Sequence, residues 1–201
     1  MVRYPRGHKE RTREQIVETA ARAFREEGVA GVGIGELMGR AGLTHGGFYA
    51  HFPSKDALVA EACERAVDDS WAAMHTLVAQ APPGEELATF IRAYVSRTHR
   101  DDPGAGCMMP TLGGEMPRHG AEVRAAFTAQ IRRVMENIEQ LLPPSPDRED
   151  RALTLATGMA GAVLLARAVD DPALSDRVLR VCRGFWAEQF ATPPADPSTP
   201  A

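Results

Sequence analysis

The stretch that decides the fold runs from Ala41 to Lys55 and reads Ala-Gly-Leu-Thr-His-Gly-Gly-Phe-Tyr-Ala-His-Phe-Pro-Ser-Lys. Gly42 follows an amphipathic run of helical periodicity and marks a turn. Thr44 is then expected to cap a second helix through its hydroxyl, and Pro53 ends that helix after about two turns. Two short helices joined by a glycine turn predict a helix-turn-helix, whose second helix enters the major groove of DNA.

Two phenylalanines in this second helix predict how it is held. Phe48 and Phe52 stand four residues apart, so they share one face and are expected to pack inward together against Ile16, Ala20 and Leu37. The other side chains of the helix are left facing outward, where a nucleic acid could meet them.

The glycines and the residues after the helix add two expectations. Gly46 and Gly47 are poor helix formers, each costing about 1 kcal/mol relative to alanine. We interpret this tolerated cost as a need for close approach to a nucleic acid. Ser54 is predicted to cap the next helix, and Lys55 in its first turn opposes the helix dipole, which a bridging phosphate would offset.

Residues 42–58, with the motif Tyr-x-His-Phe-x-x-Lys, resemble the recognition helix of the TetR (tetracycline-repressor-like) family, and the likeness covers Arg11 to about Ala62. The resemblance implies a dimeric, ligand-responsive transcriptional regulator in which a ligand between the middle helices tilts the helix that begins at Ser54. It places Thr44, His45 and Gly47 toward bases and Tyr49, His51 and Lys55 toward phosphates. The segment around Gly33 departs from the family pattern because no Ser or Thr is present to cap the first helix of the motif.

Composition excludes several other classes of protein. With 201 residues, 44% hydrophobic and 25% charged, the chain is expected to be a soluble protein of one or two domains. No apolar run reaches the ~20 residues needed to span a bilayer, and the basic, polar start predicts no signal peptide. Cys63, Cys107 and Cys182 form no paired motif, which favours a reducing cytoplasm and argues against a disulfide framework or a metal site. No cofactor is expected.

Charge is distributed unevenly along the chain. Residues 1–55 carry nine Lys/Arg and six Asp/Glu, whereas the remainder carries fourteen and twenty-one, giving the net −4. A basic beginning on an acidic body is typical of a DNA-binding module joined to a module that does not bind DNA. For the basic arm alone, a merely solvated segment is an equal alternative.

The helical periodicity predicts an all-α fold of about nine helices, with no strand. We expect a flexible basic arm over residues 1–8, a helix-turn-helix domain over 9–53, a ligand-binding and dimerisation domain over 54–190, and a disordered tail over 191–201. Among the helices we expect one over 9–27 that ends at Gly28, a single helix over 85–99, and a long one over 119–142.

The helix around Leu153 to Leu165 is apolar on nearly every side, so it is either a buried core helix or a subunit interface. We favour an interface, because little chain remains to cover the last two helices and the family dimerises through such a pair. The expected interface residues are Gly158, Gly161, Leu165, Val178, Cys182 and Phe185.

Aromatic residues and methionines gather on the middle helices. For any one of them a core position is the better interpretation, but as a group they fit the effector pocket that the family has between these helices. The candidate lining is Trp71, Met74, Phe90, Tyr94, Met108, Met109, Leu112, Phe127 and Met135. Cys107 beside two methionines is more readily a buried hydrophobe than a redox sensor.

No GxSxG, HExxH or Walker motif supports an enzyme. The interpretation is therefore a homodimeric repressor, released from a palindromic DNA operator by a small apolar effector, with no membrane partner. An all-α metabolite-binding protein or enzyme without DNA binding is the alternative. A membrane-surface or scaffold protein would account for the basic arm but not for the glycine-rich helix.

Overall fold

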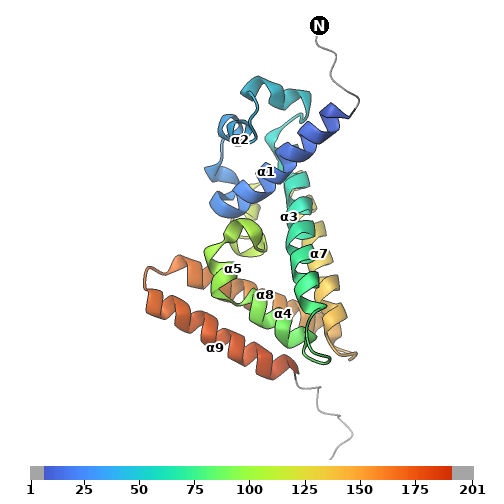
Figure 1. Cartoon of the computed structure of the whole chain (residues 1–201), viewed down its shortest axis with the longest axis vertical. Coiled ribbons are helices and arrows are strands. Elements are labelled where there is room, and N and C mark those ends of the chain that lie inside the picture. Colours follow the sequence, from blue (N-terminus) through green and yellow to red (C-terminus); the bar gives the residue numbers. More distant parts are fainter. Residues whose placement is uncertain (1–6, 192–201) are drawn as a thin grey trace, which may run out of the picture. The chain divides into compact units, whose positions relative to one another are not determined.

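The computed structural model describes residues 7–191. Within that range the chain forms nine α-helices and three short 3-10 turns, with no strand, which confirms the all-α prediction (Figure 1). The elements are α1 (His8–Gly31), α2 (Ile34–Arg40), η1 (His45–Ala50), α3 (Lys55–Val78), α4 (Glu86–Tyr94), α5 (Arg97–Asp101), η2 (Pro103–Ala105), α6 (Met109–Leu112), η3 (Met116–Arg118), α7 (Ala121–Leu141), α8 (Arg148–Ala168) and α9 (Pro172–Ala191).

The chain divides into two compact units. One runs up to Ser70 and also takes in Asp102–Gln130; the other holds Trp71–Asp101 and the chain from Ile131 onward. Helices α3 and α7 therefore have a part in each unit. The functional boundaries predicted after residues 8 and 53 are not tested by this division. All of the expected tail except Ala191, which ends α9, lies outside the described residues, as does nearly all of the expected arm.

Helix α1 bends at the glycine where the sequence predicted its end. Gly28 has φ 77° and ψ 165°, a backbone conformation that only glycine adopts readily, and a last helical turn follows it to Gly31. The glycine thus interrupts the helix without ending it. The side chain of Glu115, from a distant segment, holds the turn that follows the bend.

The helix predicted over 85–99 is wrong as a single element, because the chain breaks between α4 and α5. Val95 leaves the helical region with ψ 67°. The hydroxyl of Ser96 accepts the N–H of His99 (3.1 Å) and so caps the start of α5. The ring Nδ1 of His99 lies 2.7 Å from the carbonyl oxygen of Tyr94, which satisfies the end of α4. The apolar positions end at Val95 and α5 contains no apolar residue, so the apolar pattern carried no information about where one helix stops and the next begins.

Helices α8 and α9 lie side by side, close to the predicted bounds (Figure 1). Helix α8 buries a face of small residues and Leu155, Met159 and Val163. Gly158 lets the helices approach, since a Cβ there would lie 2.1 Å from Cζ2 of Trp186 on α9. Over residues 7–191, no helix combines the length and the apolar character needed to cross a membrane.

Candidate nucleic-acid interface

The turn between α2 and η1 is built on glycine, as the sequence predicted. Gly42 has φ 69°, and the N–H of Leu43 donates to the carbonyl of Met38 over 2.8 Å. The side-chain amide of Gln15 on α1 donates to the carbonyl of Ala41 (2.8 Å). These bonds fix the direction in which the chain leaves α2.

The second element of the motif is a 3-10 helix rather than the predicted α-helix. It runs over six residues, and two glycines with weak α propensity open it after His45. The predicted hydroxyl cap is also wrong, because the side chain of Thr44 makes no capping hydrogen bond. Instead the backbone carbonyl of Thr44 accepts the N–H of Gly47 over 3.0 Å.

Phe48 and Phe52 hold this element to the rest of its unit, as predicted. Both side chains are completely buried, and their rings stack with centroids 5.7 Å apart. The guanidinium of Arg13 lies 4.3 Å from the ring centroid of Phe52 and forms an ion pair with Glu61 on α3. Ile16, Ala20 and Leu37, the predicted partners, are buried in the same unit.

Three of the predicted DNA-facing side chains point to solvent. Thr44 and His45 are exposed, and Tyr49 exposes 63% of its surface although its ring packs edge-on against Phe48. Together they form the outer surface of the helix-turn-helix.

The two glycines differ in their surroundings. An added Cβ at Gly47 would rest 3.7 Å from Met38 Cε and from Thr44 Oγ1, so this position faces its own domain. At Gly46 it would enter open space, with no heavy atom of the described chain within 4 Å. Neither residue has positive φ. Gly46 is therefore the glycine that faces outward, and no sequence signal distinguishes it from its neighbour.

His51 lies half-buried near several cations. Burial lowers its pKa first, and the positive charges of Lys9, Arg13 and His8 lower it further. Both effects favour the neutral form of His51, in an electropositive setting. That setting suits a neighbouring anion, and a neutral imidazole can still donate one N–H to it.

Lys55 points into the domain. Its ammonium donates to the carbonyl oxygens of Val29 (2.6 Å) and Val32 (2.5 Å), and lies 5.9 Å from the ring of Phe24. Burial lowers its pKa. The ammonium thus satisfies carbonyls where α1 ends and α2 has not yet begun, which offsets its unfavourable place at the start of α3. Ser54 caps α3 as predicted, accepting the N–H of Ala57 over 3.1 Å.

Glu115 was missed by sequence reasoning. Its carboxylate accepts the N–H groups of Val29 (3.0 Å) and Ala30 (3.2 Å), so it caps the turn that follows the bend at Gly28. A Cβ on Gly28 would lie 1.9 Å from Glu115 Oε1, so only glycine leaves room for this cap. The glycine could have signalled a bend, but nothing in the sequence relates it to a residue 87 positions later.

The residues predicted to line a pocket are distributed over both compact units. Trp71, Phe90 and Tyr94 form a chain of ring contacts with centroids 5.7 Å and 6.1 Å apart, in the unit that also holds Met74 and Met135. The remaining four residues belong to the other unit: Met108, Met109, Leu112 and Phe127. Of these, Met108 and Leu112 are nearly fully buried. Cys107 is buried.

The residues predicted at a subunit interface fall into two groups. Gly158 is explained within the chain by Trp186. Gly161 and Leu165 are exposed on α8, and Phe185 on α9 exposes 51% of its surface. Val178 and Cys182 are half-buried beside these positions.

A short helix, a glycine turn and a second short element with exposed polar and aromatic side chains define a helix-turn-helix protein. Residues 16–62 match the sequence model of the family described as bacterial regulatory proteins, tetR family. The chain thus carries the sequence signature of the TetR family over residues 16–62.

Named relatives agree with this assignment. The chain is 36% identical over 94 residues to the uncharacterized HTH-type transcriptional regulator YerO of Bacillus subtilis, covering 44% of this chain and 32% of YerO. It is 37% identical over 86 residues to the HTH-type transcriptional regulator TtgR of Pseudomonas putida, covering 43% of this chain and 39% of TtgR. The matched part thus spans well under half the length of these two relatives.

The likeness to the HTH-type transcriptional repressor NemR of Escherichia coli extends further. The two are 26% identical over 149 residues, 71% of this chain and 72% of NemR. The crystal structure of reduced NemR superposes with a TM-score of 0.75 at 21% identity, over 92% of this chain and all of that one. The structural likeness shows a shared fold.

Proposed function

We propose that this protein is a transcriptional regulator that binds duplex DNA through the surface formed by Thr44, His45, Gly46 and Tyr49. His51 contacts phosphate beside that surface, and the exposed Lys9 on α1 adds positive charge. Lys55, which resemblance alone would assign to a phosphate, holds the domain together instead.

The observation that carries the proposal is the bare backbone at Gly46. Glycine in a helical element costs stability, and here neither a positive φ nor a crowded neighbour requires it. A partner that approaches the backbone from outside does account for it. The exposed Tyr49 and His45 on either side then supply groups for the sugar-phosphate backbone and for base edges.

We further propose that the protein is a homodimer formed through α8 and α9. Leu153 and Leu165 on α8 and Val181 and Phe185 on α9 each expose about half of their surface. A second copy related by a two-fold axis would cover these side chains with their own counterparts. Gly161 lies on the same exposed face of α8 and leaves room for the partner helix.

Repression released by a small apolar effector is the remaining part of the proposal. NemR is named a transcriptional repressor, which supports repression rather than activation by this protein. The ring cluster of Trp71, Phe90 and Tyr94 supports an apolar ligand, because such rings supply contact area with few charges. An effector of this class should raise the melting temperature and weaken DNA binding, since it acts by its different affinity for the two states. Charged metabolites as the only ligands found would contradict this.

The test of DNA binding is selection from a randomised duplex library by the full-length protein at physiological salt. The expected product is an inverted repeat with half-site centres about one helical turn or more apart, because a two-fold dimer presents two recognition elements. Binding of that duplex should weaken steeply with salt. Equal affinity for the selected and the random duplexes would refute the proposal.

A further inference from the structure

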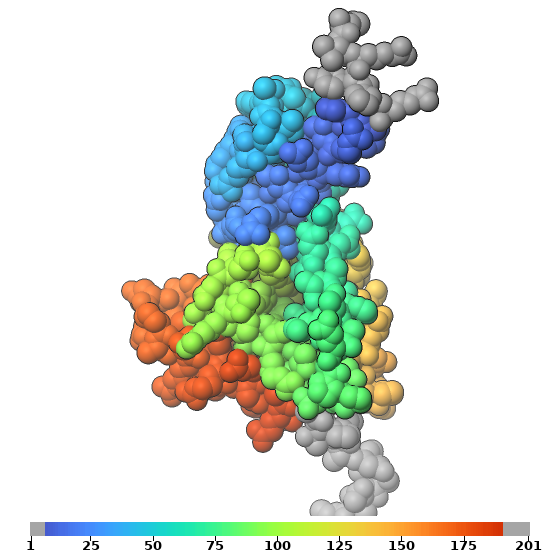
Figure 2. Space-filling model, viewed as in Figure 1, coloured from blue at the N-terminus to red at the C-terminus, as the bar shows by residue number. Residues whose placement is uncertain are grey.

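A groove beside α9 has no part in the proposed function. It has a volume of about 430 Å³ and is formed by α5 and α9. Helix α9, coloured red, lies on the viewed face of the molecule in Figure 2. The residues lining the groove are Arg97, Ala173, Asp176, Arg177, Leu179, Arg180 and Arg183.

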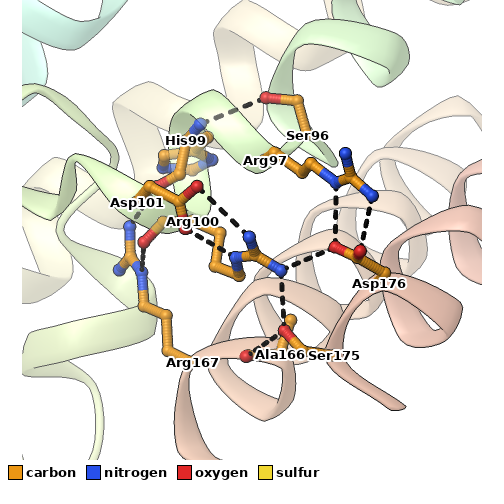
Figure 3. A network of polar contacts seen from close by, with 9 residues as sticks. All are labelled: Ser96, Arg97, His99, Arg100, Asp101, Ala166, Arg167, Ser175 and Asp176. Atoms are coloured by element: carbon orange, nitrogen blue, oxygen red, sulfur yellow. Dashed lines mark hydrogen bonds and ion pairs between the residues drawn. The ribbon is translucent and has the colours of Figure 1, made fainter. Parts of the chain in front are cut away.

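Four arginines and a single carboxylate give this lining a strong positive charge. Asp176 accepts hydrogen bonds from Arg97 (2.9 Å) and from Arg100 (2.9 Å), so two guanidinium groups share its charge (Figure 3). The hydrogen bonds from Arg97 and then Arg100 lower the pKa of Asp176. The carboxylate therefore leaves most of the positive charge of the groove uncompensated.

The other three arginines have no carboxylate partner within the described residues. Arg177, Arg180 and Arg183 follow one another at intervals of three residues along α9 and form a ridge, and no ion pair joins them to any residue between 7 and 191. This is unexpected in a region where acidic residues exceed basic ones, twenty-one against fourteen beyond residue 55. Side chains three residues apart on a helix are neighbours, so these like charges repel one another, and a bound anion would relieve that repulsion.

We propose that this groove binds a small anion that carries two or more adjacent phosphate groups. Guanidinium forks match phosphate oxygens with two parallel hydrogen bonds, which a lysine could not provide. The concave shape and the volume suit a compact ligand rather than a flat membrane or a duplex. Ala173 and Leu179 provide apolar wall for the part of the ligand that is not phosphate.

Most of the groove lies away from the proposed dimer face. Successive residues turn by about 100° around a helix, so Arg183 lies roughly opposite Val181 on α9, whereas Arg177, one turn before Val181, borders that face. A second copy on Val181 and Phe185 would therefore leave the groove open around Arg180 and Arg183. The inference also does not depend on DNA binding, and the two can fail independently.

Isothermal titration of the full-length protein with inorganic pyrophosphate at physiological salt tests the proposal. We expect one site per chain, and an affinity at least tenfold weaker in the double variant Arg180→Gln/Arg183→Gln. Arg180→Gln alone, at an exposed position, should weaken binding without a risk to folding. Arg124→Gln removes an exposed arginine of α7 from outside the groove and should leave the affinity unchanged.

Three results would overturn the proposal. The first is no binding of pyrophosphate by the wild type. The second is an equal loss in Arg124→Gln, which would indicate a general effect of net charge. The third is weaker self-association or weaker binding of a random duplex in the double variant without any effect on pyrophosphate, since the ridge would then belong to a subunit contact or to nucleic acid.

Discussion

The ammonium of Lys55 lies 2.6 Å from the carbonyl oxygen of Val29, and this contact joins the start of α3 to the end of α1. The same lysine also bonds the carbonyl of Val32, just before α2. Glu115 bonds the N–H groups on the other side of the same turn. Three segments distant in sequence thus meet at the backbone that leads into the helix-turn-helix.

Replacing Lys55 with methionine should therefore destabilise the fold. The variant keeps the aliphatic part of the side chain and removes both hydrogen bonds, so we expect a loss of about 1–3 kcal/mol in the free energy of unfolding. Urea denaturation measures it, and Lys9→Met, at the only other lysine, which is exposed, should change stability little. A phosphate role would show differently: unchanged stability with a salt dependence of DNA binding flatter by about one phosphate.

The bend at Gly28 should accept no other residue. In Gly28→Ala the positive φ is strained and the new methyl displaces Glu115, so we expect a loss of more than about 1 kcal/mol. Glu115→Gln should destabilise as well, because a neutral amide caps the turn less strongly. Gly39→Ala in α2, where a Cβ meets open space, is the matched control and should be neutral or stabilising. Thermal unfolding showing Gly28→Ala as stable as Gly39→Ala would contradict this account.

The two glycines of α8 should respond in opposite ways. Gly161→Leu places a side chain in open space within the chain, so the fold should survive while the proposed dimer is forced apart. Gly158→Ala should instead damage the fold, because its methyl meets Trp186. Sedimentation velocity and circular dichroism separate the two effects. A monomeric wild type, or an unchanged dimer in Gly161→Leu, would show that this face of α8 is no interface.

His99 should make stability depend on pH. Burial lowers its pKa from 6.5 to about 4, against the opposing hydrogen bond with the Tyr94 carbonyl, and the charge of Arg167 lowers it further. Between pH 6.5 and about pH 4, the unfolded chain binds a proton at His99 that the folded chain excludes. The contribution of neutral His99 to the free energy of unfolding is therefore complete above pH 6.5. It is lost as the pH falls toward 4, by at most about 1.4 kcal/mol per pH unit.

Urea unfolding between pH 6.5 and 5 checks this dependence. His99→Gln should remove that part of the slope, whereas His75→Gln, at an exposed position, should keep it. The same slope in the wild type and in His99→Gln would mean that His99 does not carry the effect.

Local signals made part of this site predictable. The turn at Gly42, the inward pair Phe48 and Phe52, and the Ser54 cap each depend on residues within a few positions of one another. The inward turn of Lys55 was not predictable, because the carbonyls that it bonds come from a segment more than twenty residues away.

The remaining misses have the same origin. The Glu115 cap joins residues 86 positions apart. The break between α4 and α5 depends on the ring of His99 satisfying the carbonyl of Tyr94, and the apolar pattern, which ends at Val95, gives no sign of that bond. Helical periodicity locates a buried face, but it does not specify which distant polar group will satisfy a given backbone atom.

The central claim is that the bare backbone at Gly46 exists for close contact with DNA. The most direct measurement is the affinity of Gly46→Leu for the selected inverted repeat, by fluorescence anisotropy at physiological salt, beside Gly120→Leu, where a Cβ also meets open space. The account predicts that both variants fold with nearly wild-type melting temperatures, that Gly120→Leu binds normally, and that Gly46→Leu loses at least tenfold in affinity. Wild-type affinity in a folded Gly46→Leu would contradict the claim.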